Sequence, residues 1–323
     1  MICPCACRDQ RGEPPGPFMF QASFSATASS LRRATVLVGI IPRPTSRLQQ
    51  IQQHVTSKFH SSAPFAMPPV TPPTSEHYDL LVIGGGSGGM GASRRAASYG
   101  KKVAVIEEAG KLGGTCVNVG CVPKKLMWHA SDIQDKLKEA HEYGFTDAGP
   151  SFSVPSVDWH TLAEKRDAYI RRLNGIYDNN LQKDHVAYIS GHGRLLGDGR
   201  VQVTPGVDGA LKKEVTLSAD HIVVATGGRP SIPSDDDIPG ASLGTDSDGF
   251  FAWREQPKRV AVVGAGYIAV ELAGVLHSLN SETHLLIRHD SFLRNFDPII
   301  SDTLMQYMGN TGLHVHKLSL IHI

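Results

Sequence analysis

The stretch that decides the fold is YDLLVIGGGSGG, which runs from Tyr78 to Gly89. Its apolar first half is typical of a short buried strand, and its second half has the spacing Gly-x-Gly-x-x-Gly at Gly84, Gly86 and Gly89. Glycines at this spacing permit a tight turn and let a pyrophosphate approach the N-terminus of the next helix, where free N–H groups favour negative charge. The stretch therefore predicts a strand, a turn and a helix that bind a dinucleotide.

A second apolar run strengthens this prediction. Residues 103–106 read VAVI and are followed by Glu107, about twenty residues after the glycine turn, where an acid accepts hydrogen bonds from ribose hydroxyls. The alternative is an exposed charge at a strand end. We expect a cofactor with an adenosine diphosphate moiety.

Two cysteines follow the first unit, in the segment GGTCVNVGCVPKK from Gly113 to Lys125. We expect Thr115 to cap a helix that begins at Cys116, whose thiol pKa the helix dipole would then lower. In an ideal helix the Cα atoms of Cys116 and Cys121 would lie roughly 7.5 Å apart, beyond the usual disulfide limit of about 7 Å, so a disulfide requires a distorted turn. The segment is interpreted as a redox dithiol.

Two other interpretations of these cysteines stay open. A zinc site requires four ligands, and only His129 lies near as a third. Two inert core cysteines are the other alternative, although Gly114, Thr115 and Asn118 beside them are not typical core residues.

The composition sets broad limits. The chain has 323 residues, enough for two domains, with 41% hydrophobic and 20% charged residues. A formal net charge of +1 disfavours a dedicated nucleic-acid surface, and the longest apolar runs are too short for a membrane span. Three of the five cysteines, Cys3, Cys5 and Cys7, lie at the N-terminus. This arrangement is not a secreted disulfide framework.

The N-terminal segment differs from the rest. Between Pro14 and Ser75 there is no Asp or Glu, while basic residues are scattered among Ser, Thr, Gln and Ala. This composition is typical of an organelle transit peptide followed by a proline-rich linker, and a disordered tail is the alternative. Met67 is a second possible start, so we expect a mitochondrial and a cytoplasmic form.

The middle of the chain predicts a helix over 162–177, from the spacing of its apolar residues, and strands at 186–189, 201–204 and 215–217. By spacing alone Tyr177 is more typical of a core residue than of a ligand contact. A further buried strand over 219–225 ends at Thr226, Gly227 and Gly228, which suits backbone that approaches a cofactor.

A second nucleotide unit begins at Arg259, with a strand over 259–263 and the turn Gly264-Ala265-Gly266 in a Gly-x-Gly-x-x-Ala pattern. After the next strand, 283–287, an acid would favour NAD. The chain instead has Arg288, His289 and, after a short gap, Arg294, which can pair with a 2′-phosphate. We therefore expect NADPH rather than NADH.

Together these motifs resemble the disulfide oxidoreductases that bind two dinucleotides, most closely their glutathione branch, from about residue 78 to 314. The fold class implied is α/β, with two Rossmann-like dinucleotide-binding domains, for FAD and then NADPH, of which the second is incomplete. The expected domains are a transit peptide and linker (1–75), an FAD-binding domain with the redox disulfide (76–229) and a partial NADPH-binding domain with an atypical tail (230–323).

The resemblance also implies roles for individual residues. The expected FAD contacts are Gly84, Gly86, Ser87, Gly88, Gly89, Glu107, Thr115, Cys116, Lys124, Gly193, Thr226 and Gly227. The expected NADPH contacts are Gly264, Ala265, Gly266, Tyr267, Ile268, Glu271, Arg288, His289 and Arg294. The expected glutathione contacts are Ser87, Arg94 and Tyr177. The expected catalytic residues are Cys116, Cys121, Lys124 and Glu271, with Lys124 and Glu271 forming an ion pair.

The implied reaction is the reduction of glutathione disulfide by NADPH, through FAD and the Cys116–Cys121 disulfide, in a homodimer. Trypanothione reductase and dihydrolipoyl dehydrogenase are alternatives within the family. After Lys317 the central and dimer-interface domains of the family do not follow, and residues 318–323 fit no element. We therefore expect little turnover by this chain alone, and a non-catalytic nucleotide-binding fragment or misassembled product is the alternative.

Overall fold

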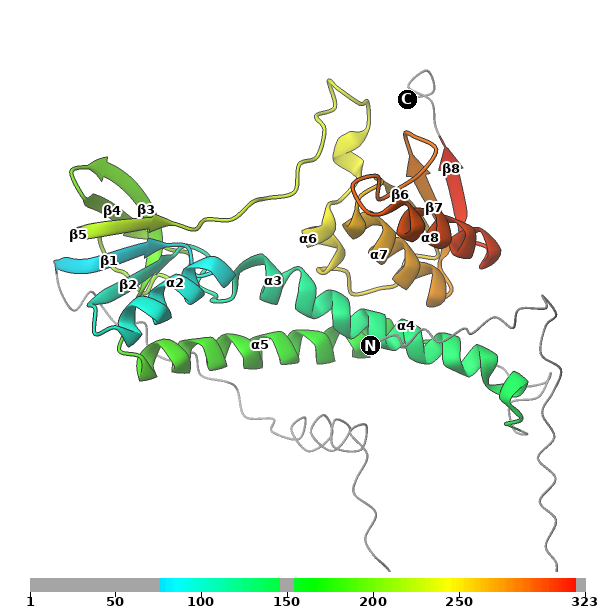
Figure 1. Cartoon of the computed structure of the whole chain (residues 1–323), viewed down its shortest axis with the longest axis horizontal. Coiled ribbons are helices and arrows are strands. Elements are labelled where there is room, and N and C mark those ends of the chain that lie inside the picture. Colours follow the sequence, from blue (N-terminus) through cyan, green and yellow to red (C-terminus); the bar gives the residue numbers. More distant parts are fainter. Residues whose placement is uncertain (1–75, 146–153, 318–323) are drawn as a thin grey trace, which may run out of the picture. The chain divides into compact units, whose positions relative to one another are not determined.

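The computed structural model describes residues 76–145 and 154–317 (Figure 1). The expected transit segment and linker, 1–75, and the tail, 318–323, lie outside the described residues. The described part contains two separate sheets, one before and one after residue 230. No described helix is both long enough and apolar enough to cross a bilayer.

The first sheet is a closed barrel in the order β1-β2-β3-β4-β5. Its strands are β1 (His77–Ile83), β2 (Val103–Glu107), β3 (Ala187–Gly197), β4 (Arg200–Pro205) and β5 (Val215–Val224). Strand β1 pairs in parallel with β2 and β5, and β2 pairs in parallel with β3. Strand β4 runs antiparallel to both of its neighbours, so the sheet is mixed. Strand β1, which lies between β2 and β5, ends at the first glycine turn.

Both faces of β1 are buried, which explains its nearly continuous apolar sequence. On one face Leu81 and Ile83 join a cluster with residues of all the other strands. On the other face Val82 packs with Met90 of α2 (Ser87–Ser98) and Leu181 of α5 (Trp159–Lys183). The helices α2 and α5 therefore cover this face, and α2 follows directly from the carboxyl end of β1, where the first candidate site lies.

Helix α5 packs against α4 (Cys121–Glu139), which follows the short helix α3 (Gly114–Asn118). A 3₁₀ turn, η1 (Ala140–Tyr143), ends this segment. Arg166 of α5 is fully buried, donates to the carbonyl of Phe251 at 2.6 Å and pairs with Asp167 at 2.8 Å. These bonds satisfy a buried charge and join α5 to the segment that precedes the second sheet.

The second sheet has the parallel order β6-β7-β8, formed by β6 (Arg259–Val263), β7 (Glu282–Ile287) and β8 (His314–Lys317). Helix α7 (Tyr267–Ser278) and helix α8 (Pro298–Asn310) contribute to its core, in which Ala273, Leu285 and Met308 pack together. Before this sheet lie η3 (Ala241–Leu243) and α6 (Ser247–Phe250). A strand, a glycine turn and a helix thus occur a second time.

The expected α/β class and Rossmann-like units are confirmed. Two details differ. The predicted strands 215–217 and 219–225 form one strand, β5, because residues 215–218 pair with β4 while residues 218–224 pair with β1. Helix α8 was not predicted. It begins with Asp297, whose side chain accepts from the N–H of Ile299, and Pro298 at its first position.

Candidate functional site

The first glycine turn joins β1 to α2, and its geometry demands glycine. Gly84 has φ 108°, in the range that side chains rarely adopt. A Cβ on Gly89 would lie 1.8 Å from the carbonyl oxygen of Gly84, so no larger residue fits there. Gly86 caps α2 without a side-chain bond, and Ser87 and Gly88 begin the helix. No side chain of the turn therefore caps the first N–H groups of α2.

Glu107 is held at the end of β2 beside this turn. One carboxylate oxygen accepts from the N–H of Gly85 at 2.7 Å, and the other accepts from the N–H of Ala109 at 2.9 Å. The side chain is half-buried, unlike a solvated charge at a strand end. Each carboxylate oxygen has a second lone pair, so Glu107 can still accept from ribose hydroxyls.

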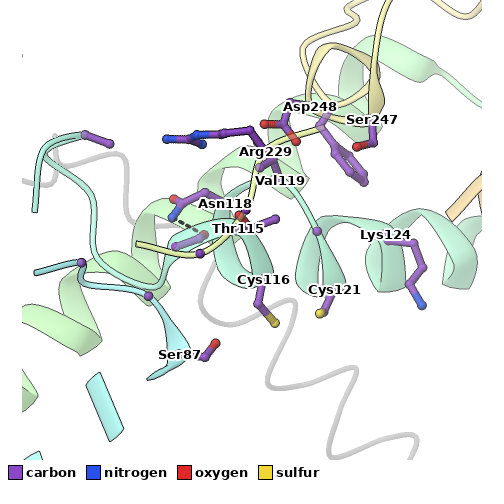
Figure 2. A pocket seen from close by; sticks show the side chains of 18 of the residues that line it. Ser87, Thr115, Cys116, Asn118, Val119, Cys121, Lys124, Arg229, Ser247 and Asp248 are labelled. Atoms are coloured by element: carbon purple, nitrogen blue, oxygen red, sulfur yellow. Dashed lines mark hydrogen bonds between the residues drawn. The ribbon is translucent and has the colours of Figure 1, made fainter. Parts of the chain in front are cut away.

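The cysteines lie on two consecutive helices instead of one. Cys116 is in the middle of α3, Cys121 is the first residue of α4, and the helices are interrupted at Val119 and Gly120. The expectation of a helix that begins at Cys116 is wrong, because α3 begins at Gly114 after Gly113 in the left-handed conformation (φ 99°). Thr115 lies within the helix and does not cap it. Figure 2 shows both sulfur atoms on the same side of this junction.

The pKa of the Cys116 thiol is raised above its ordinary value, contrary to the expected lowering. Burial is the largest cause, because it penalises the charged thiolate, and contact with Cys121 adds to it. A hydrogen bond with Ser87 acts in the opposite direction. Both cysteines are free in the structure, Cys116 half-buried and Cys121 exposed. The thiol contact supports the predicted dithiol, and the disulfide itself stays a prediction.

An ion pair joins the dithiol helix to the second nucleotide unit. The Nζ of Lys124, one turn after Cys121, lies 2.8 Å from Oε1 of Glu271 on α7. The resemblance predicted this pair, and the structure contains it. Tyr267, at the first position of α7, is exposed nearby on the same cleft. The pair brings elements 147 residues apart in the sequence to one place.

These groups line one cleft of about 820 Å³, within the usual range for ligand sites. Figure 2 shows part of its lining. The predicted residues that line it are Gly84, Gly86, Ser87, Gly88, Glu107, Thr115, Cys116, Cys121, Lys124, Thr226, Gly227, Tyr267, Ile268 and Glu271. The cleft brings together the first turn, both cysteines and the ion pair.

The residues of the first turn fit a dinucleotide. A Cβ on Gly114 would lie 2.6 Å from the Cα of Gly86, so two glycine backbones face each other without side chains between them. This bare backbone leaves room for a pyrophosphate next to the N-terminus of α2. Gly89 supports the turn by close packing and does not line the cleft.

The second turn also has the expected form. Gly264 has φ 146°, and a Cβ there would lie 3.2 Å from that of Ala269. The N–H of Leu293 donates to the carbonyl of Ala265 at 2.8 Å. This bond joins the loop before Arg294 to the turn that Gly264, Ala265 and Gly266 form. Arg288, His289 and Arg294 are all exposed after β7. These basic side chains are thus available to an anionic ligand beside the second turn.

The remaining predicted contacts lie outside the lining of the cleft. Arg94 of α2 pairs with Asp184 at 2.5 Å, and Tyr177 is half-buried against the cluster around Val82. Gly193 lies on β3, where a Cβ would be 3.2 Å from the side chain of Ile83. Their roles in binding stay predictions.

Sequence reasoning missed several residues of the site. Arg229, Asp248 and Phe251 line the cleft although no motif marks them. Asn118 and Asn174 form hydrogen bonds at the cysteine segment. Only Asn118 had a signal in the sequence, as a polar residue between two cysteines.

The fold and site define a class of protein. The chain belongs to the pyridine nucleotide-disulphide oxidoreductase family, whose profile matches residues 78–322. This confirms the resemblance found in the sequence.

Within the family, the chain is similar to three curated proteins named glutathione reductase. It is 54% identical to the protein of Schizosaccharomyces pombe over 248 residues, which are 77% of this chain and 52% of that protein. It is 55% identical to the protein of Yarrowia lipolytica over 247 residues, 75% of this chain and 50% of that protein. It is 47% identical to the protein of Debaryomyces hansenii over 256 residues, which are 75% of this chain and 52% of that protein. The chain spans about half the length of these relatives.

Proposed function

We propose that this chain carries the FAD-binding and NADPH-binding parts of a glutathione-disulfide reductase. The observation that carries the proposal is the single cleft that gathers the first glycine turn, Cys116, Cys121 and the Lys124–Glu271 ion pair. Glutathione reductases use FAD and NADPH, and similarity to three such proteins supports the same cofactors here. Trypanothione reductase and dihydrolipoyl dehydrogenase are less favoured, because Arg94 and Arg288 suit an anionic substrate and a 2′-phosphate.

Bound FAD would supply two-electron transfer between NADPH and the dithiol. The turn at Gly84–Gly89 would hold its pyrophosphate, and Glu107 its ribose. Lys124 places a positive charge in the cleft, which favours negative charge beside it, and Glu271 keeps the ammonium group in position. Arg288 and Arg294 would pair with the 2′-phosphate of NADPH.

The dithiol would reduce glutathione disulfide by two exchange steps. The Cys116 thiolate attacks one sulfur of the substrate, forms a mixed disulfide and releases one glutathione thiolate, which takes up a proton. The sulfur of Cys121, after losing its proton, attacks Cys116 and releases the second glutathione. After both steps the protein contains a Cys116–Cys121 disulfide. The two electrons that the dithiol gave up now reside on the two glutathione thiols.

Flavin retention and the first half-reaction test this function. We expect the purified chain to bind FAD and, without oxygen, to convert the Cys116–Cys121 disulfide to two thiols when NADPH is added. NADH should act more weakly. A Cys121→Ser variant is the matched control, because it should retain FAD but form no intramolecular disulfide. Failure to bind FAD, together with an NADPH-insensitive dithiol, would favour the alternative of a non-catalytic fragment.

Assembly and location are also proposals. We propose a homodimer, on the basis of family membership, which light scattering of the purified protein would test.

The acid-free basic segment before Ser75 and the internal Met67 support a mitochondrial and a cytoplasmic form. Fusion of residues 1–75 to a fluorescent protein should direct it to mitochondria, and the same fusion started at Met67 should stay in the cytosol.

A further inference from the structure

Two asparagines tie together the segment that carries the cysteines. Asn118, the last residue of α3, donates its Nδ2 to the carbonyl of Gly114 at 2.9 Å and to that of Leu112 at 3.3 Å. Asn174 of α5 donates its Nδ2 to the same Leu112 carbonyl at 2.8 Å and to Oδ1 of Asn118 at 3.1 Å. We call Asn118 and Asn174 the asparagine clamp. The clamp fixes the start and the end of α3 to one point on α5.

The two members of the clamp differ in their exposure to water. Asn174 is 8% exposed and is shielded, whereas Asn118 is half-buried and lines the cleft. A buried amide without partners is unfavourable, so the hydrogen bonds of Asn174 define one arrangement of the chain around it. An apolar side chain would fill the same space on α5 without requiring a partner. The amide therefore contributes a constraint on the cysteine segment, in addition to its packing.

The clamp ends where the helix is interrupted. Directly after Asn118 the backbone leaves the helical range at Val119 (φ −142°) and Gly120 (φ −146°, ψ −118°), and α4 begins at Cys121. A continuous helix would hold the two cysteine Cα atoms roughly 7.5 Å apart, beyond the disulfide limit of about 7 Å. The interruption is therefore the feature that permits a disulfide.

We propose that Asn118 and Asn174 are positioning residues that hold the α3–α4 junction in its interrupted form and so favour the Cys116–Cys121 disulfide over the dithiol. The inference rests on the redox role proposed above. Without the clamp, the junction relaxes toward a continuous helix, and the equilibrium moves toward the dithiol.

The equilibrium with glutathione measures this effect directly. Two chain thiols and one glutathione disulfide exchange to give the intramolecular disulfide and two glutathione thiols. The chain loses two electrons and two protons, which the two glutathione molecules gain. We expect loss of the clamp to lower the equilibrium constant for chain oxidation about tenfold, equivalent to a potential about 30 mV less negative.

The full chain and its variants would be equilibrated in glutathione redox buffers without NADPH, and then alkylated before and after reduction with two distinguishable reagents. Tryptic peptide 112–124 contains Cys116 and Cys121 and no other cysteine, so mass spectrometry of this peptide reports the dithiol alone. The variants are Asn174→Leu, Asn118→Ala and their combination. Asn179→Leu, at an exposed position of α5, is the matched control.

We expect each single variant to shift toward the dithiol, the double variant to shift little further because both changes remove one network, and the control to match the parent chain. Equal constants in all variants, or a shift toward the disulfide, would overturn the proposal. Circular dichroism and unfolding midpoints monitor folding, and failure of both single variants to fold would assign the clamp to stability and overturn its redox role. A parent chain that forms no intramolecular disulfide at any ratio of glutathione to glutathione disulfide would overturn the proposed function itself.

Discussion

Replacing Asp178 by Asn should stabilise the protein at alkaline pH. Asp178 lies on α5 and is 9% exposed, and burial raises the pKa of its carboxyl group to about 6 from 3.8. Burial, and after it the charge of Asp178, raises the pKa of Tyr188 on β3. At neutral pH the folded chain therefore holds a buried negative charge at a free-energy cost.

The size of this cost follows from the shift. The folded state binds the proton more tightly than the unfolded state, so the contribution of Asp178 to stability is complete below about pH 4 and is lost as pH rises through about 6. A shift of about two units corresponds to roughly 3 kcal/mol at about pH 8. Because a buried Asn amide has a cost of its own, we expect Asp178→Asn to raise the free energy of unfolding by about 1 to 3 kcal/mol there.

Urea unfolding of the parent chain and the variant at about pH 8 and about pH 4 measures this difference. The gain should be present at the higher pH and small at the lower, where the folded Asp178 is neutral and the unfolded one is only partly ionised. Glu164→Gln, at an exposed acid of the same helix, should change neither value by more than about 0.5 kcal/mol. The same difference at both pH values, or a less stable variant at the higher one, would refute the reasoning.

Three further predictions concern the cleft and the second turn. Gly89→Ala should destabilise the first turn by about 3 kcal/mol or more, since its Cβ would lie 1.8 Å from a carbonyl oxygen, and should abolish FAD retention measured by flavin fluorescence. Gly91→Ala, with open space around it, should retain FAD. Gly120→Ala should slow diamide-driven closure of the dithiol about tenfold or more, because its Cβ would lie 2.8 Å from the carbonyl of Thr115; an unchanged rate would contradict this. Exchange of Arg288 and Arg294 for Gln should weaken NADPH binding about tenfold in calorimetry and leave NADH binding nearly unchanged, and equal losses would argue against the 2′-phosphate assignment.

The nucleotide turns were predictable because their constraints are local. Gly84 and Gly264 occupy backbone conformations that glycine alone adopts readily, and the apolar strands before them are recognisable from a few residues. The position of Glu107 follows from the same unit. These features depend on short stretches of chain, so the sequence contains most of the information about them.

The cysteine segment was less predictable because distant residues shape it. The interruption at Val119 and Gly120 accompanies hydrogen bonds from Asn174, which follows Asn118 by 56 residues. The raised pKa of Cys116 arises from burial, which no local pattern reveals. The Lys124–Glu271 pair was expected only from the family resemblance, since no rule of spacing joins residues so far apart.

The Lys124–Glu271 ion pair also has a thermodynamic consequence. It joins the helix of the dithiol to the first turns of α7, which begins at the second nucleotide turn. A ligand at the first turn that strengthens or weakens this pair would alter the affinity for any ligand at the second turn whose binding also depends on the pair, and linkage requires the reverse effect to have the same size. Occupancy of one nucleotide site would then be measurable as a coupling free energy in titrations of the other.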